Sequence, residues 1–120
     1  MDELSAYREA IVAADGSTDA VDRLVDAVAN LDEESRVPPL LMDLRAEADR
    51  LPWIYDSDYA AVALQAALPR AVSLPVRRAM LGFALDRARW CASCATAGGE
   101  GLARSIHVRE LEALVEKDEI

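Results

Sequence analysis

Cysteine and histidine are the side chains in this sequence with the clearest potential for chemistry. Cys91 and Cys94 have the Cys-x-x-Cys spacing of dithiol redox sites, and Trp90 stands directly before them. Redox chemistry at such a pair needs a thiolate of low pKa, usually at the start of a helix. Here both cysteines fall deep inside an expected helix, on the same face as Met80 and Phe83. We therefore predict that they pack as small apolar side chains, with a redox role as the alternative.

A metal or catalytic centre would have to be built around the same few residues. Cys91, Cys94 and His107 are the only cysteines and histidine in the chain, whereas zinc takes four ligands, or three and a water. Nucleophilic catalysis needs a base beside a Ser, Cys or Thr, and a single histidine leaves little choice. The glycine-rich run 98–101 lacks the Lys-Ser/Thr that completes a phosphate-binding loop. We expect no metal, no cofactor and no enzymatic activity.

The sequence is acidic, and the excess of acid lies in its first half. The chain carries 22 acidic and 13 basic residues, a net charge of −9. Residues 1–60 hold 15 acids and 5 bases, or −10, whereas residues 61–120 hold 7 acids and 8 bases, or +1. Duplex DNA and anionic membranes would repel the first half, and a basic partner would be attracted to it. We expect a basic protein partner, and neither DNA nor a membrane.

Part of this acidity is arranged along one helix face. Four acids recur at spacings of three, four and seven residues, at Asp19, Asp22, Asp26 and Glu33. This spacing places them on one side of an expected helix, opposite its apolar side chains. Asp43 and Glu47 form another acid pair one helical turn apart. The pattern predicts an anionic partner-binding surface, although a merely solvated face would give the same pattern.

An aromatic and acidic connection follows in the sequence. It contains Trp53, Tyr55, Asp56, Asp58 and Tyr59, and these five residues are candidates for partner binding. Trp and Tyr are enriched at the energetic centres of interfaces, and neighbouring acids would add charge specificity. For Trp53, packing in the core between helices is an equally good explanation as partner binding. We expect Tyr55, Asp56 and Asp58 to be exposed.

Basic residues are concentrated in the second half. Five arginines stand within twenty residues, at Arg70, Arg77, Arg78, Arg87 and Arg89. We expect them to form ion pairs with the acidic first half, either within one chain or across a dimer. An RNA or phosphate site is the alternative.

Hydrophobic periodicity predicts an all-α protein. Six amphipathic or apolar helices are expected, at about 2–14, 19–31, 38–51, 58–68, 75–97 and 102–117. No stretch alternates apolar and polar residues for long enough to predict a strand. Short connections favour antiparallel neighbours, so we expect either a compact bundle or a short stack of helical hairpins. The whole chain, 1–120, is expected to form a single helical domain.

Local signals define some of the helix ends. Gly16 suits the left-handed position that ends the first helix. The pair Pro38-Pro39 suits the first turn of the third helix, where a missing N–H costs nothing. Asp56 or Ser57 is expected to cap the fourth helix, which is apolar nearly all round and should therefore lie at the centre of the fold.

Composition also suggests where the protein acts. No run approaches the ~18 apolar residues of a membrane span, and the charged N-terminus lacks the apolar core of a signal peptide. We expect a soluble, cytoplasmic protein. Alanine is abundant and Lys117 is the only lysine, which suggests a GC-rich bacterial genome.

These patterns favour a binding protein over an enzyme. The leading interpretation is a small acidic protein that neutralises a basic partner, in its most concrete form a bacterial immunity protein or antitoxin that inhibits a toxin domain. The alternative is a helical scaffold or regulatory subunit that forms a homodimer through apolar helix faces.

Overall fold

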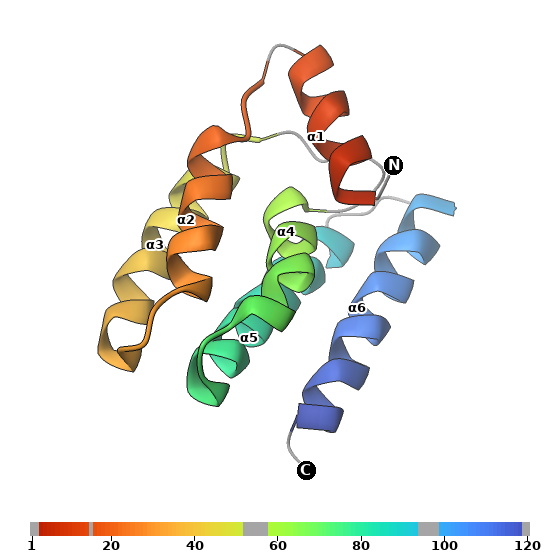
Figure 1. Cartoon of the computed structure of the whole chain (residues 1–120). Coiled ribbons are helices and arrows are strands. Elements are labelled where there is room, and N and C mark those ends of the chain that lie inside the picture. Colours follow the sequence, from red (N-terminus) through yellow and green to blue (C-terminus); the bar gives the residue numbers. More distant parts are fainter. Residues whose placement is uncertain (1–2, 15, 52–57, 94–98, 119–120) are drawn as a thin grey trace.

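The computed structural model describes residues 3–14, 16–51, 58–93 and 99–118, and this part of the chain contains helices and connections without strands (Figure 1). The α-helices are α1 (Glu3–Ala13), α2 (Asp19–Ala29), α3 (Val37–Ala48), α4 (Tyr59–Ala67), α5 (Leu74–Ser93) and α6 (Gly99–Asp118). Two short 3-10 helices, η1 (Glu34–Arg36) and η2 (Leu68–Arg70), precede α3 and follow α4. The prediction of an all-α protein is confirmed.

The helices form three groups side by side, and successive helices run in opposite directions (Figure 1). An α2–α3 hairpin lies on one side, α4 and α5 occupy the middle, and α6 packs along α5 on the other side. α1 lies at one end of the bundle and contacts α4. The arrangement is that of a small helical bundle, one of the two architectures that the sequence allows.

α4 lies at the centre of this bundle, as its sequence predicts. Seven of its nine residues are buried, and the two that are not fully buried are Gln65 and Ala66. The helix has no polar face, so it is surrounded by other elements on most sides. Its many alanines allow α2 and α5 to approach its backbone closely.

α2 has the clearest amphipathic pattern, because Val21, Val25 and Val28 are all buried on one face. The turn before it differs from our prediction. Gly16 does not adopt a left-handed backbone; a Cβ there would lie only 2.8 Å from Cγ2 and 3.1 Å from the carbonyl oxygen of Ile11. Its N–H also donates to that oxygen. The close approach of the two backbones, and not a left-handed conformation, explains this glycine.

The later helices agree with the expected elements but differ at their ends. Pro38 and Pro39 lie in the first turn of α3, as predicted. α6 begins at Gly99, so glycines expected to lie in the turn before it form its first residues. Within the described residues, no helix is both long enough and apolar enough to span a bilayer.

Candidate functional site

The predicted acidic stripe is only partly available at the surface. Asp19 and Asp26 are exposed, but Asp22 is half-buried and has three partners within the molecule. Its carboxylate accepts hydrogen bonds from the Tyr59 hydroxyl at 2.6 Å and the Thr18 hydroxyl at 2.8 Å. It also pairs with Arg8 at 3.2 Å. Asp22 therefore serves the packing of α1, α2 and α4.

The other members of the stripe have different surroundings. Asp26 forms an ion pair with Arg70 at 2.9 Å between two exposed side chains. Glu33 is exposed but lies beyond the end of α2, where it precedes η1. The predicted stripe is thus broken after Asp26, because α2 ends at Ala29 and not near residue 31.

The expectation that Asp58 is exposed is wrong, and Tyr59 is not a surface residue either. Asp58 is 1% exposed and Tyr59 is 2% exposed. Asp58 is the N-cap of α4, where its Oδ1 accepts a hydrogen bond from the Ala61 N–H at 3.1 Å. The cap expected at residue 56 or 57 is therefore residue 58. Trp53, Tyr55 and Asp56 lie outside the described residues.

Asp58 is buried because Arg87 of α5 reaches it. The Arg87 guanidinium donates to Asp58 Oδ2 from Nε at 3.1 Å and from Nη2 at 2.6 Å. Its Nη1 donates to Asp49 at the end of α3. Burial alone would lower the pKa of Arg87, but the hydrogen bonds and negative charges of Asp58 and Asp49 outweigh it and raise that pKa. Arg87 thereby fixes the end of α3 to the start of α4.

Tyr59 forms a second internal polar contact. Burial raises its pKa to about 12, and the hydrogen bond and charge of Asp22 act in the same direction. The phenol is therefore a donor at neutral pH and ties α4 to α2.

The expected pairing of arginines with the acidic first half is confirmed for Arg70 and Arg87, whereas Arg89 pairs loosely with Glu112 of α6 at 3.7 Å.

Of the two cysteines considered for redox or metal chemistry, the structure describes one. Cys91 is buried, as predicted, and Cys94 lies outside the described residues. Among the side chains that the structure describes, no three cysteines, histidines or carboxylates gather closely enough to hold a metal ion.

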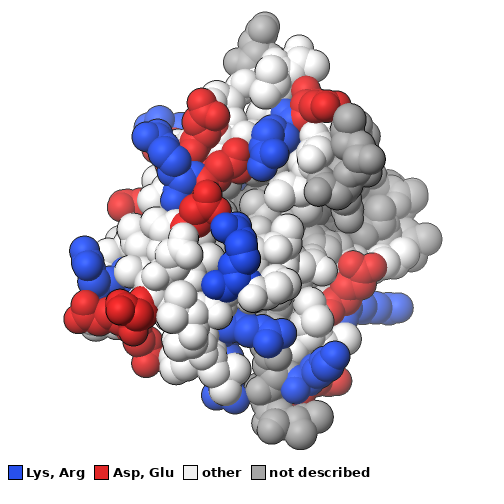
Figure 2. Space-filling model, in the orientation of Figure 1, with Lys and Arg blue, Asp and Glu red and all other residues white. Residues whose placement is uncertain are grey.

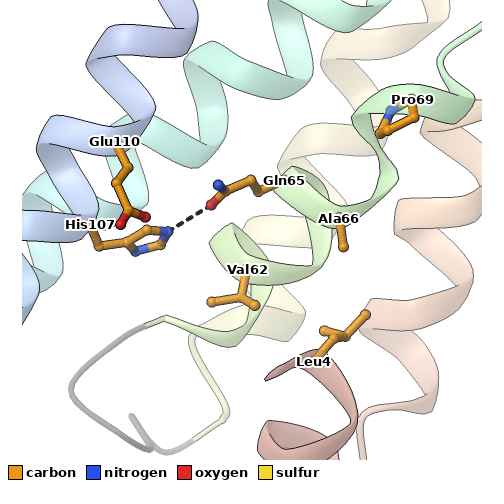
Figure 3. Close-up of a pocket in the computed structure, with 7 residues that line it drawn as sticks. All are labelled: Leu4, Val62, Gln65, Ala66, Pro69, His107 and Glu110. Atoms are coloured by element: carbon orange, nitrogen blue, oxygen red, sulfur yellow. Dashed lines mark hydrogen bonds between the residues drawn. The ribbon is translucent and has the colours of Figure 1, made fainter. Parts of the chain in front are cut away.

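His107 lies at a recess between α4, α6 and the start of α1, with a volume of about 390 Å³ (Figure 3). Its Nε2 is 3.0 Å from Oε1 of Gln65. Figure 3 shows Glu110 one turn further along α6, and Val62 and Leu4 forming the apolar part of the recess. His107 holds α6 to α4, which fits a half-buried histidine at a helix boundary.

A larger groove runs between α2 and α3, with a volume of about 500 Å³. It is lined from α2 by Ala20, Arg23, Leu24 and Ala27, and from α3 by Asp43, Ala46 and Glu47. The three alanines leave this space open because their side chains end at Cβ. The acid pair noted in the sequence therefore borders a groove, whereas the alanines were not among our predicted site residues. Their signal in the sequence is the spacing of Ala20 and Ala27, two turns apart on a partly exposed flank.

The helical hairpin that carries this groove is acidic. Residues 19–48 hold eight acids and three bases, a net charge of −5 in a chain of net −9. Asp32, Glu33 and Glu34 are consecutive and exposed in the turn between α2 and α3. Figure 2 shows acidic side chains gathered at the lower left, where Figure 1 places that turn, whereas acids and bases alternate over the centre of this view.

No protein-family model, curated protein or solved structure matches this chain. The fold and the surface chemistry are therefore the basis of the functional argument.

Proposed function

We propose that this protein binds a basic protein partner through the outer face of its α2–α3 hairpin, and that it neutralises that partner by covering it. The single observation that carries this proposal is the groove between α2 and α3, which combines an alanine-rich floor with the carboxylates of Asp43 and Glu47. We call this groove and the acidic turn 32–34 together the hairpin surface.

The shape and chemistry of the groove fit lysine and arginine side chains. Such side chains bury their aliphatic stems along apolar surface and keep their charged ends beside polar groups. Here the stems would lie along Leu24 and the alanines, and the charged ends would meet Asp43 and Glu47. Arg23 also lines the groove, so the lining has a net charge of −1 and the additional attraction comes from the turn.

The distribution of charge also supports a fast association with a basic partner. Because the hairpin carries a net charge of −5, the field of the molecule would steer a cationic protein toward that side. A role as an immunity protein or antitoxin is the most concrete form of the proposal, because inhibition by coverage requires a rigid acidic surface and no catalytic group. It is supported by composition and surface chemistry alone.

Affinity capture followed by titration tests the proposal. Immobilised wild type is used to capture proteins from the organism that encodes it, beside the variant Asp43→Lys/Glu47→Lys. The matched control is Glu9→Lys/Glu116→Lys, which makes the same change of charge at exposed positions on α1 and α6. We expect wild type and control to capture the same basic protein and the groove variant to lose it.

The captured protein, made recombinantly, is then titrated at about 50 mM and about 300 mM salt, because exposed charges are screened over ~8–10 Å at intermediate ionic strength. We expect association to slow as the salt concentration rises. An acidic partner, or an affinity that ignores both the salt and the groove variant, contradicts the proposal. Growth inhibition by the partner alone, relieved by co-expression of this chain, tests the inhibitor role.

A homodimeric scaffold is a second candidate. The observation that favours it is the pair of exposed apolar side chains at Val72, which lies between η2 and α5, and Leu74, which begins α5. Sedimentation of wild type and of Val72→Ser/Leu74→Ser separates the two functions. A dimer that dissociates in this variant favours the scaffold, whereas a monomer over the whole concentration range excludes it.

A further inference from the structure

α2 carries a second apolar stripe beside the one that packs in the core. Its buried valines form the first stripe, on the side where α2 packs against α4. Ala20, Leu24 and Ala27 form the second, at spacings of four and three residues, and all three line the groove between α2 and α3. This is the spacing with which one helix presents a seam to another helix. α2 therefore has the pattern of a helix contact on two sides, and α4 occupies one of them.

α3 forms the other wall of the groove and adds charge to it. Asp43, Ala46 and Glu47 lie within about one turn of each other on this wall. Asp43 is exposed, and the half-buried Glu47 has a loose contact with the exposed Arg50 at 3.8 Å. On the opposite wall, Arg23 of α2 is exposed. Negative charge thus borders the groove along α3, and positive charge borders it along α2.

The walls of the groove favour a helix over an extended segment. An extended segment that is covered by a groove needs the backbone of a strand edge to bond its own N–H and C=O groups. Residues 20–27 and 43–47 lie inside α2 and α3, whose backbone groups are bonded within each helix. A helix satisfies its own backbone and needs only side-chain contacts. Because the alanines of both walls end at Cβ, its axis could approach to about 8–10 Å, the ordinary distance between packed helices.

We propose that the segment of the basic partner that occupies this groove is an amphipathic helix. The proposal rests on the proposed function and specifies what enters the groove. Large apolar side chains at intervals of three and four residues would lie over the alanines. Lysines or arginines one turn apart would meet Asp43 and Glu47, and an acid on the other flank would meet Arg23. The groove follows about two turns of α2, so the contact would extend over roughly 10 Å of helix.

A peptide with this pattern tests the proposal on the full chain. The probe is acetyl-LKALKQELKALKQEL-amide, whose helical form has leucines on one face, lysines on one flank and glutamates on the other. Reversing the direction of a helix exchanges its two flanks, so one of the two directions along the groove brings the lysines to α3 and the glutamates to α2. Opposite charges on the two walls should select that direction.

Two further peptides and two protein variants serve as comparisons. Proline in place of both glutamines, which face away from the leucines, keeps every contacting side chain but breaks the helix. Exchange of lysine and glutamate reverses the charge of both flanks. In the protein, Ala27→Leu/Ala46→Leu fills the groove without changing its charge, and Ala13→Leu/Ala113→Leu makes the same change at exposed positions on α1 and α6. Titration calorimetry measures the affinities, and the methyl signal of Ala20 reports whether the peptide lies in the groove.

We expect the helical peptide to bind wild type and the Ala13→Leu/Ala113→Leu control equally and to shift the Ala20 signal. The proline peptide, or the filled groove, should lower the affinity about tenfold or more. The charge-exchanged peptide should bind about fivefold more weakly.

The helix in the groove is overturned if the helical peptide does not bind, or if the proline peptide or the filled groove binds as tightly. The proposed function is decided separately, because it fails if the captured partner binds Asp43→Lys/Glu47→Lys as tightly as wild type. A captured partner that is lost with that variant but retained by Ala27→Leu/Ala46→Leu leaves the proposed function standing and overturns the helix.

Discussion

Two ion pairs in this protein use the same residue types and have opposite roles. Asp26 and Arg70 meet at 2.9 Å, and their side chains are 57% and 54% exposed. Asp58 and Arg87 meet at 2.6 Å, and their side chains are 2% and 5% exposed. Both aspartates belong to the acidic first half and both arginines to the same basic stretch, so sequence position does not separate the pairs.

Burial decides what each charge can do. An exposed pair gains little from its own attraction, because water and salt screen it, so its members remain available to a partner. A buried pair has lost its hydration, and each member then depends on the other. The α2–α3 hairpin keeps its charges at the surface with the exception of Asp22, whereas the contact between α4 and α5 uses its charges to fix the fold.

The largest expected effect is at the buried pair. Asp58→Asn keeps an N-cap acceptor for α4 but leaves Arg87 without its main counter-charge. We expect the free energy of unfolding to fall by about 3 kcal/mol, because a buried cation becomes uncompensated. Urea denaturation followed by circular dichroism measures the change. A loss below about 1 kcal/mol would show that Asp49 alone is sufficient to neutralise Arg87.

An intermediate effect is expected at Tyr59, whose partner Asp22 is half-buried. The pKa of Tyr59 is raised to about 12 in the folded state, above the ordinary value of 10. The folded protein therefore holds this proton more tightly than the unfolded chain does. This tighter binding of the proton stabilises the folded state below pH 10, and the stabilisation is lost as the pH rises toward 12. At about 1.4 kcal/mol per pKa unit, and discounted for partial solvation, we expect a loss of about 2 kcal/mol.

Urea midpoints at neutral and strongly alkaline pH, compared between wild type and Tyr59→Phe, isolate that loss from the titration of other groups. Tyr59→Phe should be less stable than wild type at neutral pH by about 1 kcal/mol, because a hydrogen bond is removed. As the pH rises toward 12 the difference should shrink and then change sign, because only wild type loses the stability linked to the Tyr59 proton. A constant difference across that range would contradict the role of burial at Tyr59.

The smallest effect is expected at the exposed pair. Asp26→Asn is the same substitution as the one at Asp58, but it removes a carboxylate that water already solvates. We expect the free energy of unfolding to change by less than about 0.5 kcal/mol. Thermal unfolding of the two variants side by side provides the comparison, and equal losses would remove the distinction between the two regions.

Sequence reasoning succeeded where one helix determines the outcome. The absence of a polar face on α4 was sufficient to predict its central position, and Pro38 and Pro39 marked the start of α3. It failed at Asp58, because the burial of this acid depends on Arg87, 29 residues later. Nothing local shows which of several arginines will reach a given acid.

The groove between α2 and α3 was not predicted for a different reason. Alanine favours helix formation and occurs in cores and on surfaces alike, so its presence in a sequence does not show where it will lie. Only the packing of α2 against α3 shows that Ala20, Ala27 and Ala46 leave a space beside Asp43 and Glu47. The acid pair was visible in the sequence, but its apolar floor was not.

Alanine methyl groups provide the most direct test of the hairpin surface. The chain, labelled with ¹³C at alanine methyls, is titrated with the basic partner identified by capture. We predict that the signals of Ala20, Ala27 and Ala46 shift on binding, while that of Ala13, exposed on α1, remains unchanged. A tight complex that leaves the three groove methyls unchanged would contradict the account.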